Sequence, residues 1–499
     1  MAQEPKEIWF LTGSQHLYGS DTLAQVAAHS QEIAKYLDAS GQLPARVVCK
    51  PTLTGPDEIL EACVEASSST ACIGVITWMH TFSPSKMWIA GLTRLDKPLA
   101  HLHTQFNREL PWGEIDMDFM NLNQSAHGDR EFGFIGARLR LNRKIVVGHW
   151  QDPDVLDQLE VWARACSALA ESRRLKIARF GGMNMREVAV TGGDRVEAQI
   201  KFGWAVNGHA MGDLAKWIEA VDESRIGPLL EEYEESYRVA PELARDGARR
   251  DSLRKAARQE LGMRAFLEDG RFGAFTTTFE DLYGMDQLPG LACQRLMAAG
   301  YGFGAEGDWK TAAMVRLMKV MGAGRPGGVS FMEDYTYHLA KGQEKILGAH
   351  MLEVCPSIAA GKPSLEIHHL GIGGKADPCR LVFAAGTGTG VNATLVDLGG
   401  RMRLIVNTLD VVGPDAAMPK LPVACAVWVP RPDFKRGCQA WIQAGGAHHS
   451  GFSLSVTPEH LEDLAGMLDL EYIRIDAGTE LTALKNELRW NDAAYRLKG

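Results

Sequence analysis

The chain has 499 residues, of which 45% are hydrophobic and 23% are charged, and its formal net charge is −9. This composition is typical of globular enzymes, and the length suggests about three domains at roughly 150 residues each. The acidic balance argues against nucleic-acid binding, because proteins that bind nucleic acids concentrate Lys and Arg in a basic patch. We therefore expect no nucleic-acid partner.

Targeting and cysteine patterns both favour the cytoplasm. The N-terminal residues 1–13 contain no long apolar core after a basic region, so we expect no signal peptide. The longest apolar runs, such as 421–430, fall far short of the ~18 residues that a membrane helix needs. The nine cysteines form no C-x-x-C pair, which indicates reduced thiols. We expect a cytoplasmic protein with no membrane partner.

The first third of the chain alternates strand and helix patterns. The expected strands are 8–12, 45–49, 72–78 and 98–104, and the expected helices are 56–66 and 21–37, the latter with Asp21 as its N-cap. Strands that alternate with helices imply a parallel sheet covered on both faces. Ligands bind at the carboxyl ends of such strands, which are followed here by residues 12–16 and 79–82.

Two further blocks follow the first. From Lys176, Gly-rich turns lie beside strand patterns, and helical patterns cover 226–237 and 249–268. The last block holds short strand candidates, a hairpin turn at 398–401, and helices near 458–469 and 480–489. The predicted fold class is α/β, with two doubly wound parallel-sheet (Rossmann-like) domains followed by a β-rich, β-barrel-like C-terminal domain. The predicted boundaries are 1–176, 177–328 and 329–499.

The run from Gly302 to Gly307 matches the dinucleotide fingerprint G-x-G-x-x-G. The fingerprint requires a strand before the run and a helix after it. We expect a helix from Asp308, but residues 293–299 before the run also have a helical pattern. A Gly-rich turn that presents Glu306 at a helix start is the favoured interpretation, and a dinucleotide-dependent sugar oxidoreductase is the alternative.

Two acids and two imidazoles, Glu306, Glu333, His350 and His449, lie in otherwise apolar or turn-forming segments. Two carboxylates and two imidazoles can bind a divalent metal ion and leave room for a polyol. Each residue also has a simpler interpretation: Glu306 as a first-turn acid, Glu333 on a solvated turn, His350 as a core histidine, and His448 and His449 as a surface pair. A non-catalytic sugar-binding protein is a further alternative, although the missing secretion signal argues against it.

Distinctive strings run through nearly the whole chain. They are GSQHLYG (13–19), MHTFSPSKMW (79–88), HTQFN (103–107), DMDFMNLNQSAHGDREFGF (116–134), TTTFEDL (276–282), EGDWKTA (306–312), FMEDYTY (331–337), GAHMLEVCPS (348–357), HHLGIGGK (368–375), PKLPVA (419–424) and GGAHH (445–449). These strings resemble those of bacterial L-arabinose isomerases. The resemblance implies a manganese-dependent aldose–ketose isomerase that converts L-arabinose to L-ribulose, the first step of L-arabinose catabolism, and in many members D-galactose to D-tagatose.

The resemblance also implies site residues, a cofactor and an assembly. The metal ligands that it implies are Glu306, Glu333, His350 and His449, of which Glu306 and Glu333 are also catalytic. The sugar-binding residues that it implies are Gln15, Leu17, His127, Met185, Phe279, Met351 and Ile372. We expect one Mn²⁺ per subunit, with Co²⁺ or Mg²⁺ as substitutes. The expected assembly is a homohexamer, a dimer of trimers, with active sites at subunit interfaces and a small aldose as the partner.

The expected chemistry moves a proton from C2 to C1 of the sugar through a cis-enediol. A divalent cation stabilises the developing enediolate as a Lewis acid, and a carboxylate carries the proton. A hydride shift is the competing route. The sequence departs from the family at Ala305, where the family commonly has Gly before the first ligand glutamate. If that position needs a positive φ, Ala305 would strain the loop.

Overall fold

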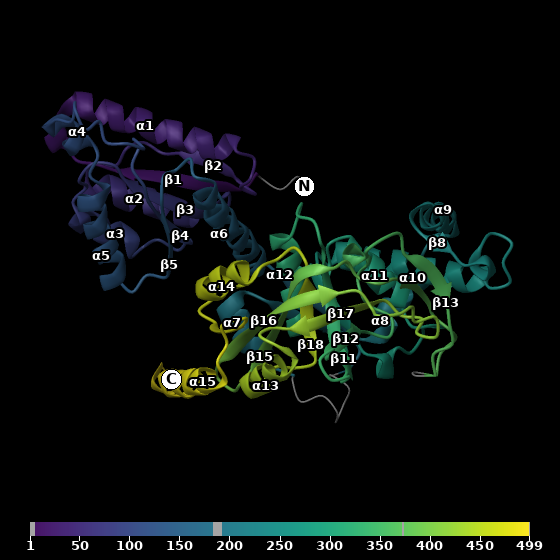
Figure 1. Ribbon diagram of the computed structural model, residues 1–499. Coiled ribbons are helices and arrows are strands. Elements are labelled where there is room, and N and C mark those ends of the chain that lie inside the picture. The colour runs from purple at the N-terminus through teal and green to yellow at the C-terminus, as the bar shows by residue number, and fades with distance from the viewer. Residues whose placement is uncertain (1–4, 183–191, 372–373, 499) are drawn as a thin grey trace. The chain divides into compact units, whose positions relative to one another are not determined.

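The computed structural model describes residues 5–182, 192–371 and 374–498 (Figure 1). The contacts between residues divide the chain into two compact units, residues 1–170 and 171–499, which are described separately below. The three-domain division at 176 and 328 stays a prediction. Within the described ranges, no helix is both long enough and apolar enough to cross a membrane.

Unit 1 contains a five-stranded parallel sheet in the order β2-β1-β3-β4-β5. Its strands are β1 Glu7–Gly13, β2 Arg46–Cys49, β3 Cys72–Met79, β4 Leu99–His103 and β5 Arg143–Val147. Its helices are α1 Gly19–Ala39, α2 Pro56–Ser68, α3 Trp88–Leu92, α4 Met117–Leu122, α5 Arg130–Arg138 and α6 Pro153–Ser172, with short turns η1 His16–Tyr18, η2 Ser85–Met87 and η3 Ser125–Asp129. The parallel α/β fold predicted for this part of the chain is confirmed.

The prediction that Asp21 caps the first helix is wrong. The turn η1 leads directly into α1, so Tyr18 occupies the N-cap position and Asp21 lies inside the first turn. An acid there still favours the helix, because the N-terminal end of a helix carries partial positive charge.

One face of the unit 1 sheet is covered by α2, α3 and α5, whose side chains form a single core with Trp9 and Leu11 of β1. Helix α1 lies on the other side of the strands from α3 and α5 (Figure 1). At the carboxyl edge, Ser14 after β1 lies 2.6 Å from Thr81 after β3, oxygen to oxygen. The two predicted strand-end segments therefore meet between β1 and β3, where the strand order reverses. Open α/β sheets bind ligands at such a point.

Unit 2 begins with a four-stranded parallel sheet in the order β10-β9-β6-β7. Its strands are β6 Lys176–Phe180, β7 Ala205–His209, β9 Ala274–Thr277 and β10 Gly302–Ala305. The helices of this part are α7 Arg195–Phe202, α8 Met211–Glu219, α9 Ile226–Ser236, α10 Arg250–Asp269, α11 Gly290–Ala298 and α12 Trp309–Met321, with short turns η4 Glu223–Arg225, η5 Pro241–Leu243 and η6 Phe279–Asp281.

The glycine run at 302–307 was expected to form a turn, and this expectation is wrong for its first half. Gly302 and Gly304 lie inside β10, against α12. A Cβ on Gly302 would lie 2.1 Å from the carbonyl oxygen of Ala312, and one on Gly304 would lie 2.3 Å from that of Asp308. These glycines therefore allow close packing of strand and helix rather than providing a phosphate-binding turn.

The rest of unit 2 is built on a β-barrel. Its strands are β11 Val329–His338, β12 Lys345–Ala349, β15 Gly388–Asp397, β16 Met402–Val412, β17 Cys425–Pro430, β18 His449–Ser453 and β19 Glu471–Ile475. They pair in the order β15-β18-β11-β12-β17-β16-β19, and β15 also pairs with β16, which closes the sheet on itself. The predicted hairpin at 398–401 joins β15 to β16, with Gly399 and Gly400 both at φ 77° as a two-residue hairpin turn requires.

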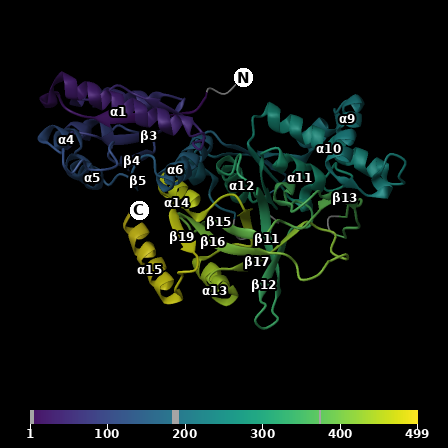
Figure 2. The same ribbon diagram turned by 45° about the horizontal axis from the view of Figure 1, so that its top comes forward.

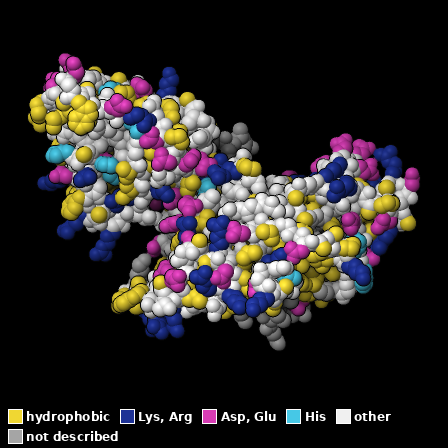
Figure 3. Space-filling model, in the orientation of Figure 1, with side chains coloured by type: hydrophobic (Ala, Val, Ile, Leu, Met, Phe, Trp, Pro, Cys, Tyr) yellow, Lys and Arg dark blue, Asp and Glu magenta, His cyan; other side chains and the backbone are white. Residues whose placement is uncertain are grey.

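Helices and a small sheet complete unit 2. The remaining elements are α13 Phe434–Ala444, α14 Pro458–Met467, α15 Leu481–Lys498, the turn η7 Pro356–Ile358, and the strands β8 Arg238–Val239, β13 Ser364–Ile367 and β14 Cys379–Val382. Helices α13 and α15 lie beside one another and pack on β16 and β19 (Figure 2). Acidic side chains gather over α9 (Figure 3), and two of them pair with arginines, Glu234 with Arg250 at 2.8 Å and Glu232 with Arg295 at 2.5 Å.

Candidate metal and active site

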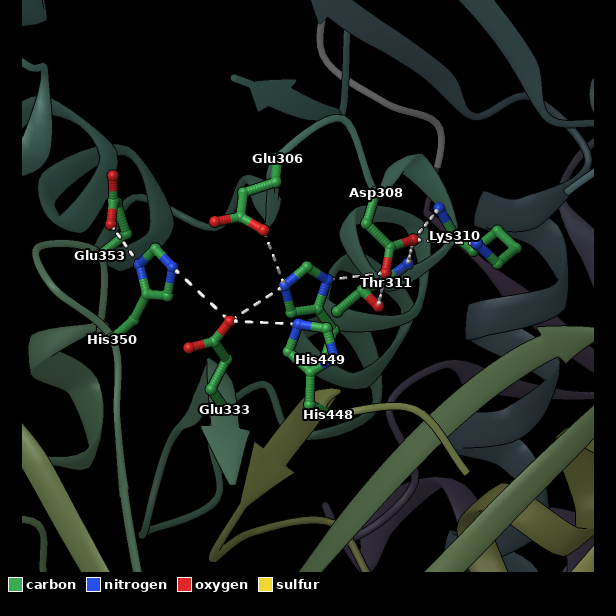
Figure 4. Close-up of polar contacts among 9 residues, drawn as sticks. All are labelled: Glu306, Asp308, Lys310, Thr311, Glu333, His350, Glu353, His448 and His449. Carbon is green, nitrogen blue, oxygen red and sulfur yellow. Dashed lines mark hydrogen bonds and ion pairs between the residues drawn. The ribbon is translucent and has the colours of Figure 1, made fainter. Parts of the chain in front are cut away.

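Four elements of unit 2 bring the predicted acids and imidazoles together (Figure 4). Glu333 lies in β11, where its direct cross-strand neighbours are His449 in β18 and Ala349 in β12. His350 follows Ala349 at the end of β12, and Glu306 follows the end of β10. The barrel register therefore fixes the Glu333, His449 and His350 positions, and the neighbouring parallel sheet supplies Glu306.

The ligand atoms of this cluster lie close together. His449 Nε2 is 3.2 Å from Glu333 Oε1 and 3.8 Å from Glu306 Oε2, and His350 Nε2 is 3.9 Å from Glu333 Oε1. His448, which the sequence analysis did not include among the ligands, places its Nε2 3.5 Å from Glu333 Oε1. Glu306, Glu333, His448 and His449 each offer one ligand atom, and these four atoms lie within 4.8 Å of one another.

Two further carboxylates, which were not predicted from the sequence, form hydrogen bonds with the imidazole nitrogens that face away from the cluster. His449 Nδ1 lies 3.1 Å from Asp308 Oδ2, and His350 Nδ1 lies 2.5 Å from Glu353 Oε2. Since a carboxylate only accepts, each Nδ1 donates and each Nε2 faces the cluster. This carboxylate–imidazole arrangement is typical of metal-binding histidines. The signals in the sequence were the short spacings from Glu306 to Asp308 and from His350 to Glu353.

Asp308 combines this role with a structural one. It is the N-cap of α12, and its Oδ1 accepts from the backbone amides of Lys310 and Thr311 at 3.2 and 3.1 Å. The same oxygen accepts from the buried ammonium of Lys310 at 3.1 Å. Burial would raise the pKa of Asp308, but Lys310 and His449 outweigh it and hold the pKa far below its usual range. Asp308 is therefore a fixed negative charge behind His449.

The pKa values of the titratable groups in the cluster are shifted in different directions. Burial raises the pKa of Glu306 above its ordinary value, against the pull of His449 and His350. Burial acts the same way on Glu333, but the hydrogen bond from His449 and the charge of His350 outweigh it and lower that pKa. Burial lowers the pKa of His449, yet its bonds to Asp308 and Glu333 prevail and raise the pKa to about 9. The two glutamates therefore differ in proton affinity.

The backbone at Glu306 is in the left-handed region, with φ 60°. This conformation costs a non-glycine residue roughly 1–2 kcal/mol, and such strain concentrates at functional sites. Ala305, the position at which strain was suspected, lies in β10 and is not among the residues with positive φ. The expected strain therefore exists one residue further along, on the glutamate itself, and Ala305 fits the strand.

The other predicted site residues are distributed across both units. Phe279 lies in η6 and Met351 follows His350; both are half-buried. Gln15 and Leu17 follow β1, His127 lies in η3, and all three belong to unit 1, so their contact with a sugar stays a prediction. Met185 and Ile372 lie outside the described residues. Phe331, which was not predicted, packs edge-on against both His350 and His449, with ring centroids 5.1 and 5.2 Å apart.

The cluster fits a divalent metal ion by the chemistry of its donors. Carboxylate oxygens and imidazole nitrogens together suit Mn²⁺, Co²⁺ or Mg²⁺, and burial favours a charge that offsets the two glutamates. Glu333, His350 and His449 are each less than one-tenth exposed. The structure therefore contains a cluster that can hold a metal ion.

Comparisons with known proteins agree along the whole chain. Three family models match it: the L-arabinose isomerase N-terminal domain at residues 2–174, the central domain at 176–324 and the C-terminal domain at 328–471. An L-arabinose isomerase of Geobacillus stearothermophilus is 60% identical over 496 residues, which cover 99% of each chain. One of Herpetosiphon aurantiacus is 60% identical over 491 residues, 98% of each chain. The chain therefore belongs to the L-arabinose isomerase family of enzymes.

Proposed function

We propose that this protein interconverts L-arabinose and L-ribulose as a metal-dependent aldose–ketose isomerase. The observation that supports this most directly is the convergence of Glu306 and Glu333 on imidazoles that are themselves held by carboxylates. Membership of an isomerase family supports the same reaction class. In metabolism, this reaction is the first step of L-arabinose catabolism.

The proposed cofactor is one Mn²⁺ per subunit, held by Glu306, Glu333, His350 and His449, with Co²⁺ or Mg²⁺ as substitutes. When bound, the ion supplies Lewis acidity that stabilises negative charge on the sugar oxygens. Asp308 and Glu353 keep the two imidazoles in the tautomer whose Nε2 faces the cluster. His448 lies close enough to Glu333 to support the same ligand set.

The proposed proton transfer uses the two glutamates as a pair. One carboxylate takes the proton from C2 and returns it to C1, and the other exchanges the proton between the two oxygens of the cis-enediol. Their pKa values shift in opposite directions, which suits one group to hold a proton while the other stays ionised. Phe279 and Met351 are proposed to line the sugar pocket, with Gln15, Leu17 and His127 as further sugar contacts.

The substrate range and the assembly are parts of the same proposal. We propose D-galactose, which gives D-tagatose, as a second substrate, because one small extra substituent changes binding by only about 1–3 kcal/mol. The proposed assembly is a homohexamer, a dimer of trimers with active sites at subunit interfaces, and the proposed location is the cytoplasm. The proposed protomer has the three domains 1–176, 177–328 and 329–499.

The decisive experiment measures ketose formation from L-arabinose by metal-stripped protein, with and without added Mn²⁺. We expect activity only with the ion, and loss of nearly all turnover in Glu306→Gln and in Glu333→Gln. Glu61→Gln, an exposed glutamate on α2, is the matched control and should retain full activity. Substantial turnover in either cluster variant, or full activity after metal removal, would sink the proposal.

A second experiment separates the two possible routes of hydrogen transfer. In D₂O, the enediol route exchanges the migrating proton with solvent and places deuterium at C1 of the ketose. A hydride shift leaves C1 free of deuterium. Ketose whose C1 carries solvent deuterium after one turnover supports the proton transfer; its absence over many turnovers of a reversible reaction would favour the hydride route.

A further inference from the structure

A second group of metal-type side chains lies in unit 1 and shares no residue with the cluster of unit 2. It consists of His101 and His103 of β4 and Asp129 at the end of η3. One nitrogen of each imidazole and one carboxylate oxygen lie within 4.8 Å of one another. The two histidines are two residues apart on one strand, so both side chains point to the same face of the sheet, the face that α5 covers.

The carboxylate of Asp129 is shared between the two imidazoles. Its Oδ1 lies 2.7 Å from His101 Nε2, and its Oδ2 makes a short contact with His103 Nδ1. Asp129 is fully buried, and His101 is 3% exposed. A buried carboxylate requires a positive or hydrogen-bonding partner at each oxygen, and here both oxygens face nitrogen atoms that can also bind metal ions.

The backbone of Asp129 is helical, at φ −71° and ψ −25°, because η3 runs directly into α5. Its side chain accepts no hydrogen bond from the first turn of α5 and is directed to the two histidines. The preceding turn η3 is π-helical, a rare geometry that is frequent at functional sites.

The surroundings make this group rigid on one side and accessible on the other. His101 packs edge-on against Phe132 of α5, with ring centroids 5.0 Å apart, and a Cβ on Gly133 would lie 3.6 Å from its ring. The His103 side chain is 23% exposed. A metal ion bound here would therefore have two ligands fixed by packing and an open side next to His103, where water or another ligand could coordinate.

We propose that His101, His103 and Asp129 form a second divalent-metal site, which takes an ion of the Zn²⁺ type such as Zn²⁺, Co²⁺ or Ni²⁺. Two imidazoles and one carboxylate are a common open set for these ions, at ligand distances of about 2.0–2.2 Å. Binding requires that the ring nitrogen facing Asp129 carries no proton on either histidine, and a neutral imidazole meets this condition by carrying its proton on the other nitrogen. This proposal is independent of the function proposed for unit 2.

The test counts Zn²⁺ ions in the full-length chain by elemental analysis after chelator treatment, reloading and desalting. The variant Glu306→Gln/Glu333→Gln/His449→Gln disables the cluster of unit 2 and serves as the background. We expect one Zn²⁺ per chain in this background. Adding Asp129→Asn to the background should reduce this to none, whereas adding His149→Gln, another imidazole of unit 1, should leave it at one.

Cobalt provides a second measurement. Co²⁺ held by two imidazoles and a carboxylate in a four- or five-coordinate site absorbs visible light, so the background should show such bands and His103→Gln should remove them. Because the side chain of His103 is partly exposed, this variant decides the matter even if Asp129→Asn does not fold. A background protein that binds no Zn²⁺, or equal binding with Asp129→Asn or His103→Gln, would mean that the three residues form only a hydrogen-bonded group.

Discussion

Replacing Asp308 by Asn tests whether the carboxylate behind His449 organises the proposed metal site. The amide oxygen of Asn can still accept from the amides of Lys310 and Thr311, so the N-cap of α12 is retained. The negative charge disappears, however, while the side chain of Lys310 remains buried at 1% exposure. Removing one partner of a buried ion pair costs about 3–5 kcal/mol, and we expect a loss of unfolding free energy in that range.

The effect on the metal site follows from the bond between Asp308 Oδ2 and His449 Nδ1. Without the carboxylate, His449 loses the acceptor that fixes its tautomer and orientation. Loss of such a partner weakens metal binding by about 10- to 100-fold, which corresponds to about 1.4–2.7 kcal/mol. The assays are urea unfolding and Mn²⁺ titration against a competing fluorescent chelator.

Asp194→Asn is the matched control, because Asp194 also caps a helix, α7, and accepts from the amides two and three residues on. It touches no residue of the cluster among the contacts described here, so Mn²⁺ affinity should be unchanged. If folded Asp308→Asn binds Mn²⁺ within about twofold of the wild type, then Asp308 does not orient His449 for metal binding.

Three other predictions concern backbone strain, packing and charge. Glu306→Gly should be more stable to urea than Glu306→Ala by about 1 kcal/mol, because only glycine adopts φ 60° without strain; equal stabilities would contradict this. Gly304→Ala should cost about 1–3 kcal/mol, since its Cβ would lie 2.3 Å from a carbonyl oxygen, whereas Gly212→Ala has open space and should not destabilise; a fully stable Gly304→Ala would refute the packing argument. Burial would raise the pKa of Glu171, but Arg316, 2.7 Å away, outweighs it and holds the pKa below 4.5. The stability that this pair adds is therefore present above pH 4.5 and is lost as pH falls through the folded-state pKa, so Glu171→Gln should flatten that acid-side loss in urea titrations, and an unchanged profile would contradict the assignment.

Local patterns in the sequence predicted much of the fold. The apolar run at 8–12 forms β1 and the Gly399-Gly400 turn joins β15 to β16, because both depend on neighbouring residues alone. Sequence patterns that fit two different local structures were less informative. The glycines at 302 and 304 could have formed a turn, and only the approach of α12 shows why they lie in a strand. The C-terminal domain was predicted to be β-rich and barrel-like, but the strand order of the closed barrel depends on pairings between distant segments.

Residue type suggested the candidate ligands, but only a family resemblance assigned them to one site, and the barrel register explains why. Glu333 meets His449 because β11 pairs antiparallel with β18, and it lies near His350 because β11 also pairs with β12. Neither pairing leaves a fixed spacing in the chain. Asp308 and Glu353, in contrast, are close in sequence to residues that were predicted, and the spacing of a carboxylate near a candidate imidazole would have been sufficient to suggest them.

The same register makes the site sensitive to changes far from it. In a strand, a slip of one residue turns every side chain to the opposite face. In β11, Met332 packs in the barrel core with Trp428, so the next residue, Glu333, points to the opposite face, between Ala349 of β12 and His449 of β18. Gly348 on β12 leaves room for Trp428, since a Cβ there would lie 2.0 Å from the Trp428 ring. Core packing around Trp428 therefore fixes the register that aligns Glu333 with His449 and His350. We infer that this site depends on the barrel core for its geometry as much as on the ligands themselves, so that loss of packing in the barrel should reduce metal affinity before the chain unfolds.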